Sequence, residues 1–181
     1  MRETDPVTPL DDLMAREQIR QLVYRYSTAI ADRDVDLMAS LYVADASFGP
    51  YGQGPAALRE IMGATMGDLS FGVILVANHL IELDDDQHAH GEVWARCHAQ
   101  NAEGYYEQLI KYVDRYRLER GAWLFEHRKH LLWFGEARDS PLAQPPADWP
   151  ARQVGVGQLA LADETVREWR ASVDAPERGS S

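Results

Sequence analysis

The first half of the chain carries apolar residues at the spacing of an amphipathic helix. Five apolar residues recur three or four positions apart: Ile19, Leu22, Val23, Tyr26 and Ile30. Residues at these spacings share one face of a helix, so the pattern predicts a long helix with one buried stripe. Asp11 or Asp12 can cap its first turn, because a carboxylate accepts hydrogen bonds from the unpaired first-turn amides.

Two further helices are predicted before the middle of the chain. Asp34 can cap a short helix that carries the apolar residues between positions 35 and 42. The segment 46–48 is a candidate for a short strand, and a loop rich in glycine and proline follows it. Pro55 suits the first turn of a third helix, which is expected to run to about Met66.

The second half of the chain changes to the pattern of strands. Four segments suit strands: 71–83, 88–101, 105–118 and 122–134. The polar residues 84–87 and 119–121 between them are typical of hairpin turns. Helices followed by consecutive hairpins predict an α+β fold, in which a curved, mostly antiparallel sheet packs over about three N-terminal helices.

The length of 181 residues favours a single domain. We expect a flexible arm at 1–10, the α+β domain at 11–135 and a C-terminal tail at 136–181, with a short helix at 163–173. The tail is longer than such a domain needs. We expect it to pack across a partner chain or to close a pocket, with Trp149 and Trp169 as anchors.

Composition and charge exclude several classes of function. Hydrophobic residues make up 45% and charged residues 26%, as is usual for globular proteins. The formal net charge is −11, whereas nucleic-acid backbones are bound by basic patches, so we expect no nucleic-acid partner. No apolar run reaches the roughly 20 residues of a membrane helix, and the N-terminus lacks a signal-peptide layout, so we expect a cytoplasmic protein without membrane association. Cys97 is the only cysteine, which excludes an internal disulfide.

Three runs of the sequence resemble the SnoaL-like family of the nuclear transport factor 2-like superfamily. They are YRYSTAIADRDVDLMASLYVADASF (24–48), ANHLIELDDDQHAHGEVW (77–94) and KYVDRYRLERGAWLFEHRKHLLW (111–133). The superfamily includes polyketide cyclases, scytalone dehydratase, bile acid dehydratase, ketosteroid isomerase and a lindane dehydrochlorinase. The resemblance covers about residues 11–135 and implies a cone-shaped barrel with an interior pocket. It also implies a homodimer or a higher homo-oligomer, since many members dimerise through the sheet.

The resemblance further implies a reaction that removes a proton next to a carbonyl or at another activated carbon, without a cofactor. Members use an Asp or His base, often as a pair, because burial raises the pKa of a carboxylate and an Asp orients a His ring. In this chain the two usual positions hold Ala31, five residues after Tyr26, and Ile74, four residues before Asn78. Neither Ala31 nor Ile74 can transfer a proton.

Other side chains are therefore the candidates for catalysis. Tyr26 matches the tyrosine that polarises a substrate oxygen in the dehydratases, as the resemblance implies. His98, or else His79 or Asp32, is the candidate base. Each has an ordinary structural alternative, since Tyr26 suits a helix core, Asp32 a solvated turn and a sheet histidine a satisfied hydrogen-bond network.

Seven residues are candidates for contact with a hydrophobic small molecule: Ala31, Tyr42, Ile74, Val93, Cys97, Arg128 and His130. Alternation along a strand places Val93, Ala95, Cys97 and Ala99 on one face and His98 on the other. The same rule places Arg128 and His130 on the face of Leu124 and Glu126, unless a bulge intervenes.

Two polar motifs are given a structural role. Tyr112, Asp114 and Tyr116 follow the strand pattern of the family and recur in members with different activities, which implies a role in the fold. We expect Asp114 to accept hydrogen bonds from buried donors. His88 and His90 lie beside three aspartates, but two histidines are too few for a closed metal site. We expect a solvated hairpin turn there and no bound metal.

The function that we expect is that of a cofactor-independent lyase or isomerase. Its substrate would be hydrophobic and oxygenated, such as a polyketide, a steroid or a terpenoid. Two alternatives stay open. One is a ligand-binding or interaction protein on the same scaffold, which Ala31 and Ile74 favour. The other is the accessory β subunit of a ring-hydroxylating oxygenase, which shares this fold.

Overall fold

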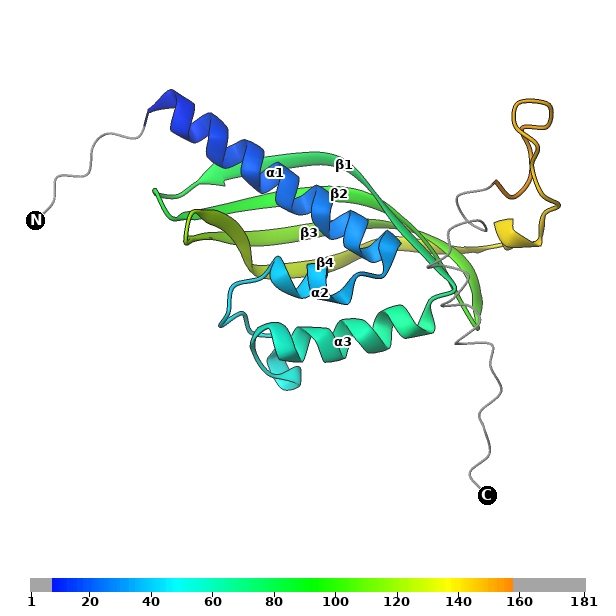
Figure 1. Ribbon diagram of the computed structural model, residues 1–181, viewed down its shortest axis with the longest axis horizontal. Helices are drawn as coiled ribbons and strands as arrows, with labels where there is room; N and C mark the ends of the chain where they lie inside the picture. The colour runs from blue at the N-terminus through cyan, green and yellow to red at the C-terminus, as the bar shows by residue number, and fades with distance from the viewer. Residues whose placement is uncertain (1–7, 158–181) are drawn as a thin grey trace, which may run out of the picture.

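The computed structural model describes residues 8–157 of the chain. Their α-helices are α1 (Pro9–Asp32), α2 (Val35–Ser40) and α3 (Gly54–Asp68), and their strands are β1 (Phe71–Leu83), β2 (His88–Asn101), β3 (Gly104–Glu119) and β4 (Ala122–Arg138). The predicted α+β class is confirmed, with helices first and an antiparallel sheet after them. The sheet curves but is not closed into a barrel (Figure 1). No helix in the described part of the chain has the length and apolar content needed to cross a membrane.

The helix starts follow from their capping residues. Helix α1 begins at Pro9, two residues before the predicted start, because Thr8 rather than an aspartate is the N-cap. The Thr8 hydroxyl accepts a hydrogen bond from the Asp11 amide at 3.2 Å, and the Asp11 carboxylate accepts one from the Thr8 amide at 3.0 Å. The prediction for α2 is confirmed, since the Asp34 carboxylate accepts from the Leu37 amide at 2.7 Å.

The four strands lie in the order β1-β2-β3-β4, and each is joined to the next by a hairpin. The predicted strand at 46–48 is wrong for the described structure, where Ser47 makes only an isolated bridge to Gln53. The backbone groups of this segment bond to their own loop, since Ala46 accepts from the Gly54 amide at 2.8 Å and Phe48 donates to the Gly52 carbonyl at 2.9 Å. The segment therefore has no free edge to offer the sheet.

The three helices cover one face of the sheet, which we call the inner face (Figure 1). The core lies between the two layers and includes Ile19 and Val23 of α1, Val93 of β2 and Phe125 of β4, each at most 1% exposed. Along β2, Val93, Ala95 and Ala99 are buried, which confirms the predicted alternation. Helix packing on one face leaves the other face, the outer face, free of helices.

Two of the three β-bulges in the sheet decide on which face the candidate residues of β1 and β4 lie. The pairing of β1 with β2 shifts by one residue between Val76 and His79, so that His79 lies opposite Val93 on the inner face. The pairing of β3 with β4 shifts between Arg115 and Tyr116, so that Arg128 lies opposite Asp114. The unbulged prediction for Arg128 and His130 is therefore wrong: they share the face of Phe125, not that of Leu124 and Glu126.

The outer face of the sheet carries exposed apolar side chains. They are Leu75, Leu80, Val113, Leu131, Trp133 and Phe134. Trp133 is 69% exposed and packs edge-on against Trp94, with ring centroids 5.4 Å apart. A homo-oligomer formed through this face stays a prediction.

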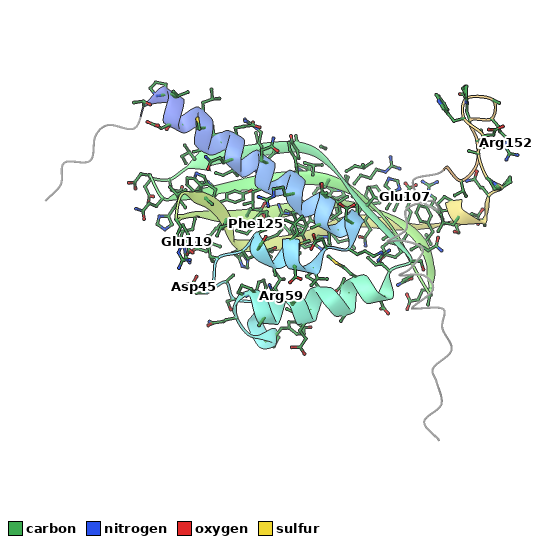
Figure 2. All side chains as sticks on the ribbon, viewed as in Figure 1. Asp45, Arg59, Glu107, Glu119, Phe125 and Arg152 are labelled. Atoms are coloured by element: carbon green, nitrogen blue, oxygen red, sulfur yellow. The ribbon has the colours of Figure 1, made fainter. Side chains whose placement is uncertain are left out.

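The chain leaves β4 as an arm that projects from the body of the molecule (Figure 1). Isolated bridges join Pro146 to Val156 and Asp148 to Arg152 within this arm, and Figure 2 shows Arg152 away from the sheet and helices. Trp149 is 76% exposed, so it anchors nothing within the described residues. The predicted helix at 163–173 and Trp169 lie outside the described residues, and the role of the tail stays a prediction.

Candidate functional site

A buried ion pair occupies the inner face where β3 and β4 lie side by side. The Arg128 guanidinium donates from Nε to Asp114 Oδ1 at 2.8 Å and from Nη2 to Asp114 Oδ2 at 2.6 Å. The side chains of Asp114 and Arg128 are 0% and 3% exposed. Two parallel bonds of this kind fix both groups in one geometry. The prediction that Asp114 accepts hydrogen bonds from buried donors is confirmed.

Aromatic rings enclose the guanidinium. The Arg128 Cζ atom lies 4.3 Å from the ring centre of Tyr26, 4.2 Å from that of Tyr112 and 4.2 Å from that of Phe125. These rings come from α1, β3 and β4, and Phe125 lies between the helices and the sheet (Figure 2). Contacts between a cation and ring faces stabilise a desolvated guanidinium, which is how the arginine is accommodated in the interior.

A second set of hydrogen bonds joins His79 to the same carboxylate. His79 Nε2 lies 3.0 Å from the Tyr116 hydroxyl, and that hydroxyl donates to Asp114 Oδ2 at 2.8 Å. Tyr116 is fully buried. Burial lowers the pKa of His79 to about 4, so its imidazole is neutral near pH 7. His79, Tyr116, Asp114 and Arg128 therefore form one continuous polar cluster, which we call the inner cluster.

Two polar atoms of the inner cluster have no protein partner. His79 Nδ1 and Arg128 Nη1 are both buried, and neither makes a hydrogen bond to any residue that the structure describes. Buried polar atoms of folded proteins are nearly always paired, so these two atoms are the positions at which the cluster can bind a water molecule or a ligand. The cluster can accept a proton at His79 and donate a hydrogen bond from Arg128.

The tyrosines beside the cluster are protonated phenols. Burial raises the pKa of Tyr26, and it raises those of Tyr42 and Tyr112 well above their usual value. Tyr42 joins the group through Phe125, with ring centroids 5.1 Å apart. Each hydroxyl can therefore donate a hydrogen bond, and none supplies a negative charge near neutral pH.

Most of the candidates for ligand contact lie on the inner face. Ile74 and Cys97 are paired across β1 and β2, and both are half-buried beside the core. Ala31, in the last turn of α1, is also half-buried. Burial raises the pKa of Cys97 to about 11, so its side chain is a thiol. His130 stacks obliquely on Tyr112, with ring centroids 5.4 Å apart, and burial followed by the charge of Arg128 lowers its pKa.

Two of the candidate bases lie apart from the inner cluster. His98 is on the outer face, where its Nδ1 lies 2.6 Å from the Tyr105 hydroxyl and 3.8 Å from Glu107. Asp32 is exposed in the last turn of α1. The structure thus brings His79, Tyr26, Tyr42 and Arg128 together and leaves His98 and Asp32 outside.

The part that Tyr116 and Asp114 play in this cluster was not predicted from the sequence. Both were assigned to the fold alone, because their strand pattern is shared among proteins of different activity. The signal was present in the alternation along β3, where a carboxylate lies between two aromatic residues on one face. A carboxylate in such a position must have a cationic or hydrogen-bonding partner.

The histidines near the β1–β2 hairpin are engaged by carboxylates. His88 Nδ1 lies 3.0 Å from Asp85, and His90 Nδ1 lies 2.7 Å from Asp84. Within residues 8–157, no group of three or more His, Cys, Asp or Glu side chains is placed to hold a metal ion.

A cleft of about 700 Å³ lies at the N-terminal end of α1, and no residue of the inner cluster lines it. Apolar side chains of Leu10, Met14, Leu83 and Trp123 line it, together with four aspartates. None of the candidate site residues lies in this cleft.

We expect the protein to become less stable as the pH is lowered, because of His79. In the unfolded chain this histidine binds a proton near pH 6.5, whereas in the fold its pKa is about 4. The unfolded state therefore binds more protons between these values, and the free energy of unfolding falls as pH decreases through them. Since solvent screens part of the half-buried ring, we expect a loss of about 1–2 kcal/mol. Urea unfolding between pH 7 and pH 4 measures it, and a His79→Gln variant with an equal loss would contradict the assignment.

Gly91 allows β1 and the inner cluster to approach β2 closely. A Cβ atom at this position would lie 2.4 Å from the Leu80 carbonyl oxygen, 3.3 Å from Tyr116 Cε2 and 3.4 Å from His79 Nε2. We expect Gly91→Ala to lower the free energy of unfolding by about 1–3 kcal/mol, because backbone must move to admit the methyl group. Gly63→Ala is the matched control, since its Cβ would meet nothing within 4 Å. Urea unfolding of both variants measures the difference, and equal stability would contradict the expectation.

Comparisons with known proteins agree with this architecture. The sequence profile of the SnoaL-like domain matches residues 11–129. No curated protein gives a significant match to the chain.

Several solved structures have a similar fold. One is a type-3 hexachlorocyclohexane dehydrochlorinase from Novosphingobium barchaimii, with 18% identity, 72% of this chain and 94% of that chain covered, and a TM-score of 0.66. Another is a Mycobacterium tuberculosis protein of unknown function, with 22% identity, 93% and 92% covered, and a TM-score of 0.61. A third is a nuclear transport factor 2-like protein with a cystatin-like fold from Novosphingobium aromaticivorans, with 18% identity, 68% and 85% covered, and a TM-score of 0.58. At these identities the likeness shows the fold alone.

Proposed function

Because the chain belongs to the SnoaL-like domain family, we propose that it is a cofactor-independent enzyme of the lyase or isomerase type. It acts on a small hydrophobic molecule by proton transfer on the inner face of the sheet. One observation carries the proposal. His79 Nδ1 and Arg128 Nη1, a proton acceptor and a hydrogen-bond donor, are both buried and unpartnered among the described residues.

In the proposed reaction, His79 Nδ1 takes the proton and Arg128 Nη1 stabilises the negative charge that develops. His79 Nδ1 takes a proton from a carbon next to a carbonyl, and the electron pair of the broken C–H bond forms the C=C bond of an enolate. Arg128 Nη1 and the Tyr26 hydroxyl donate hydrogen bonds to the oxygen on which negative charge develops. In an isomerisation, His79 returns the proton to a second carbon. In a dehydration, a hydroxyl group leaves and takes the proton from His79 as water.

The surroundings of the cluster favour an apolar substrate. Ile74, Val93 and Cys97 lie on the inner face, and the thiol of Cys97 is protonated. Ile74 and Cys97 are half-buried, and they lie on the same face of the sheet as His79, two same-face residue pairs along the strands. A hydrophobic ring system with one oxygen near Arg128 fits this arrangement, in keeping with pockets that combine apolar walls and few polar groups.

A ligand-binding protein without catalysis is the second candidate. The observation that favours it is the loss of proton-transfer groups at Ala31 and Ile74, the two positions that the family resemblance assigns to the acid–base pair. In that case the inner cluster would hold a ligand through Arg128 alone.

The test is solvent exchange at carbon. The full chain is incubated in D₂O with bicyclic ketones such as 2-tetralone and 2-decalone, and deuterium uptake next to the carbonyl is followed by NMR. We expect exchange about 100-fold or more above the rate in buffer, as is typical of positioned acid–base groups. His98→Gln, on the outer face, is the matched control and should exchange like the wild type. If the ketone binds but exchanges no faster than in buffer, the proposal of an enzyme is contradicted and that of a ligand-binding protein is supported.

A further inference from the structure

The inner cluster fixes where its protons lie. A tyrosine hydroxyl has one hydrogen, and the Tyr116 hydroxyl faces two neighbours, Asp114 Oδ2 at 2.8 Å and His79 Nε2 at 3.0 Å. The Asp114 carboxylate already receives two bonds from Arg128 and can only accept. If Tyr116 donated to His79 instead, its oxygen would face Asp114 Oδ2 at 2.8 Å with no hydrogen between the two oxygens. The hydroxyl hydrogen therefore points to Asp114, and the oxygen accepts from His79.

We infer that Tyr116 is a positioning residue, which holds His79 as the tautomer protonated at Nε2 and so leaves Nδ1 as the base. The inference rests on the proposed function and names the residue that sets the tautomer of its base. A base of this kind needs a free lone pair at one nitrogen and a fixed hydrogen bond at the other. Tyr116 supplies the fixed bond, and Nδ1 is the nitrogen left without a partner in the described part of the chain.

The Asp114 carboxylate is linked both to the base His79, through Tyr116, and to the hydrogen-bond donor Arg128. When Nδ1 takes a proton, the imidazolium that forms donates more strongly to Tyr116, and Tyr116 in turn bonds to Asp114. Asp114 also holds the guanidinium of Arg128 through two bonds. Hydrogen bonds through Tyr116 to Asp114, both on β3, thus replace a carboxylate in direct contact with the histidine. This arrangement is consistent with the presence of Ala31 and Ile74 at the usual positions.

Packing keeps Tyr116 and His79 in this arrangement. The Tyr116 ring is fully buried and lies 5.6 Å from the Phe125 ring, centre to centre. The His79 and Tyr116 ring centres are 6.1 Å apart. Gly91 lies against both, because even a methyl group there would come within 3.4 Å of His79 Nε2. A ring flip of His79 would place a carbon against the Tyr116 hydroxyl and lose the bond.

The experiment measures the tautomer directly, by ¹⁵N NMR of the histidine side chains in the full chain at neutral pH. The His79 signals are assigned by their loss in His79→Gln. In the wild type we expect Nε2 to be protonated and Nδ1 to be unprotonated. In Tyr116→Phe we expect a mixture of the two tautomers, with the exchange kcat lowered about tenfold or more and KM little changed.

The matched control is Tyr105→Phe, which removes a hydroxyl that contacts His98 Nδ1 at 2.6 Å on the outer face. It should leave the His79 signals and the exchange rate as in the wild type. A wild-type His79 protonated at Nδ1, or an unchanged tautomer in a folded Tyr116→Phe, would overturn the inference. If the wild type has the expected tautomer and yet catalyses no exchange, the proposed function fails and the assignment of Tyr116 as the residue that fixes the tautomer stands.

Discussion

Replacement of Arg128 by methionine is expected to lower the free energy of unfolding by about 3–5 kcal/mol. The change leaves Asp114, whose side chain is fully buried, without its cationic partner and with only the Tyr116 hydroxyl as a side-chain donor among the described residues. It also removes the cation that lies between Tyr26, Tyr112 and Phe125. Urea unfolding followed by circular dichroism measures the effect.

Two controls separate the buried charge from the loss of packing. Arg59→Met breaks an ion pair with Asp36 in which the side chains are 47% and 84% exposed, and it should cost less than about 1 kcal/mol. The double variant Asp114→Leu with Arg128→Met removes both charges, so it should be markedly more stable than Arg128→Met alone. A loss of less than about 1 kcal/mol for Arg128→Met would contradict the role of this pair in the fold.

Replacement of His79 by glutamine is expected to lower the rate of deuterium exchange by about 10²–10⁴-fold. Glutamine keeps an N–H group that can donate to Tyr116, but it has no nitrogen that accepts a proton in water. The folded structure should therefore persist while the base is lost. The measurement is the initial rate of exchange in D₂O at saturating ketone, with thermal unfolding to establish that the variant is folded.

The pH profile gives an independent check on the same residue. Since the pKa of His79 is about 4, its base form predominates from about pH 5 upward. The wild-type rate should be level between pH 5 and pH 8 and should fall tenfold per pH unit below about 4, as long as the protein remains folded. His98→Gln should retain this profile, and a His79→Gln variant with wild-type exchange would remove His79 as the base.

Local sequence patterns were sufficient for most of the secondary structure. The apolar stripe from Ile19 to Ile30 predicted α1, and Asp34 predicted the start of α2. The four strands and their hairpin turns follow from alternation and polar turns in nearby residues. Such features are local, because helix periodicity, capping and hairpin formation each depend on residues within a few positions of one another. The strand predicted at 46–48 was wrong, because the backbone there forms hydrogen bonds to its own loop instead of to the sheet.

The residues of the inner cluster could be named from the sequence only in part. Asp114 could be predicted as a buried acceptor, and His79 and Arg128 were among the candidates. That these three residues lie close together could not be predicted from the sequence, because Asp114 comes from β3, Arg128 from β4 and His79 from β1. The choice between His79 and His98 likewise depends on which face each strand turns to the helices.

By itself the sequence determined the helices, the hairpins, the acidic character and the family to which the chain belongs. Tertiary structure decided the site, through the extra residue that each of two bulges inserts, at 76–79 in β1 and opposite 115–116 in β4. The physical reason is the two-residue period of a strand, in which one inserted residue moves every later side chain to the other face. Packing of the curved sheet against the helices sets where those residues are inserted, and that packing involves segments far apart in the chain.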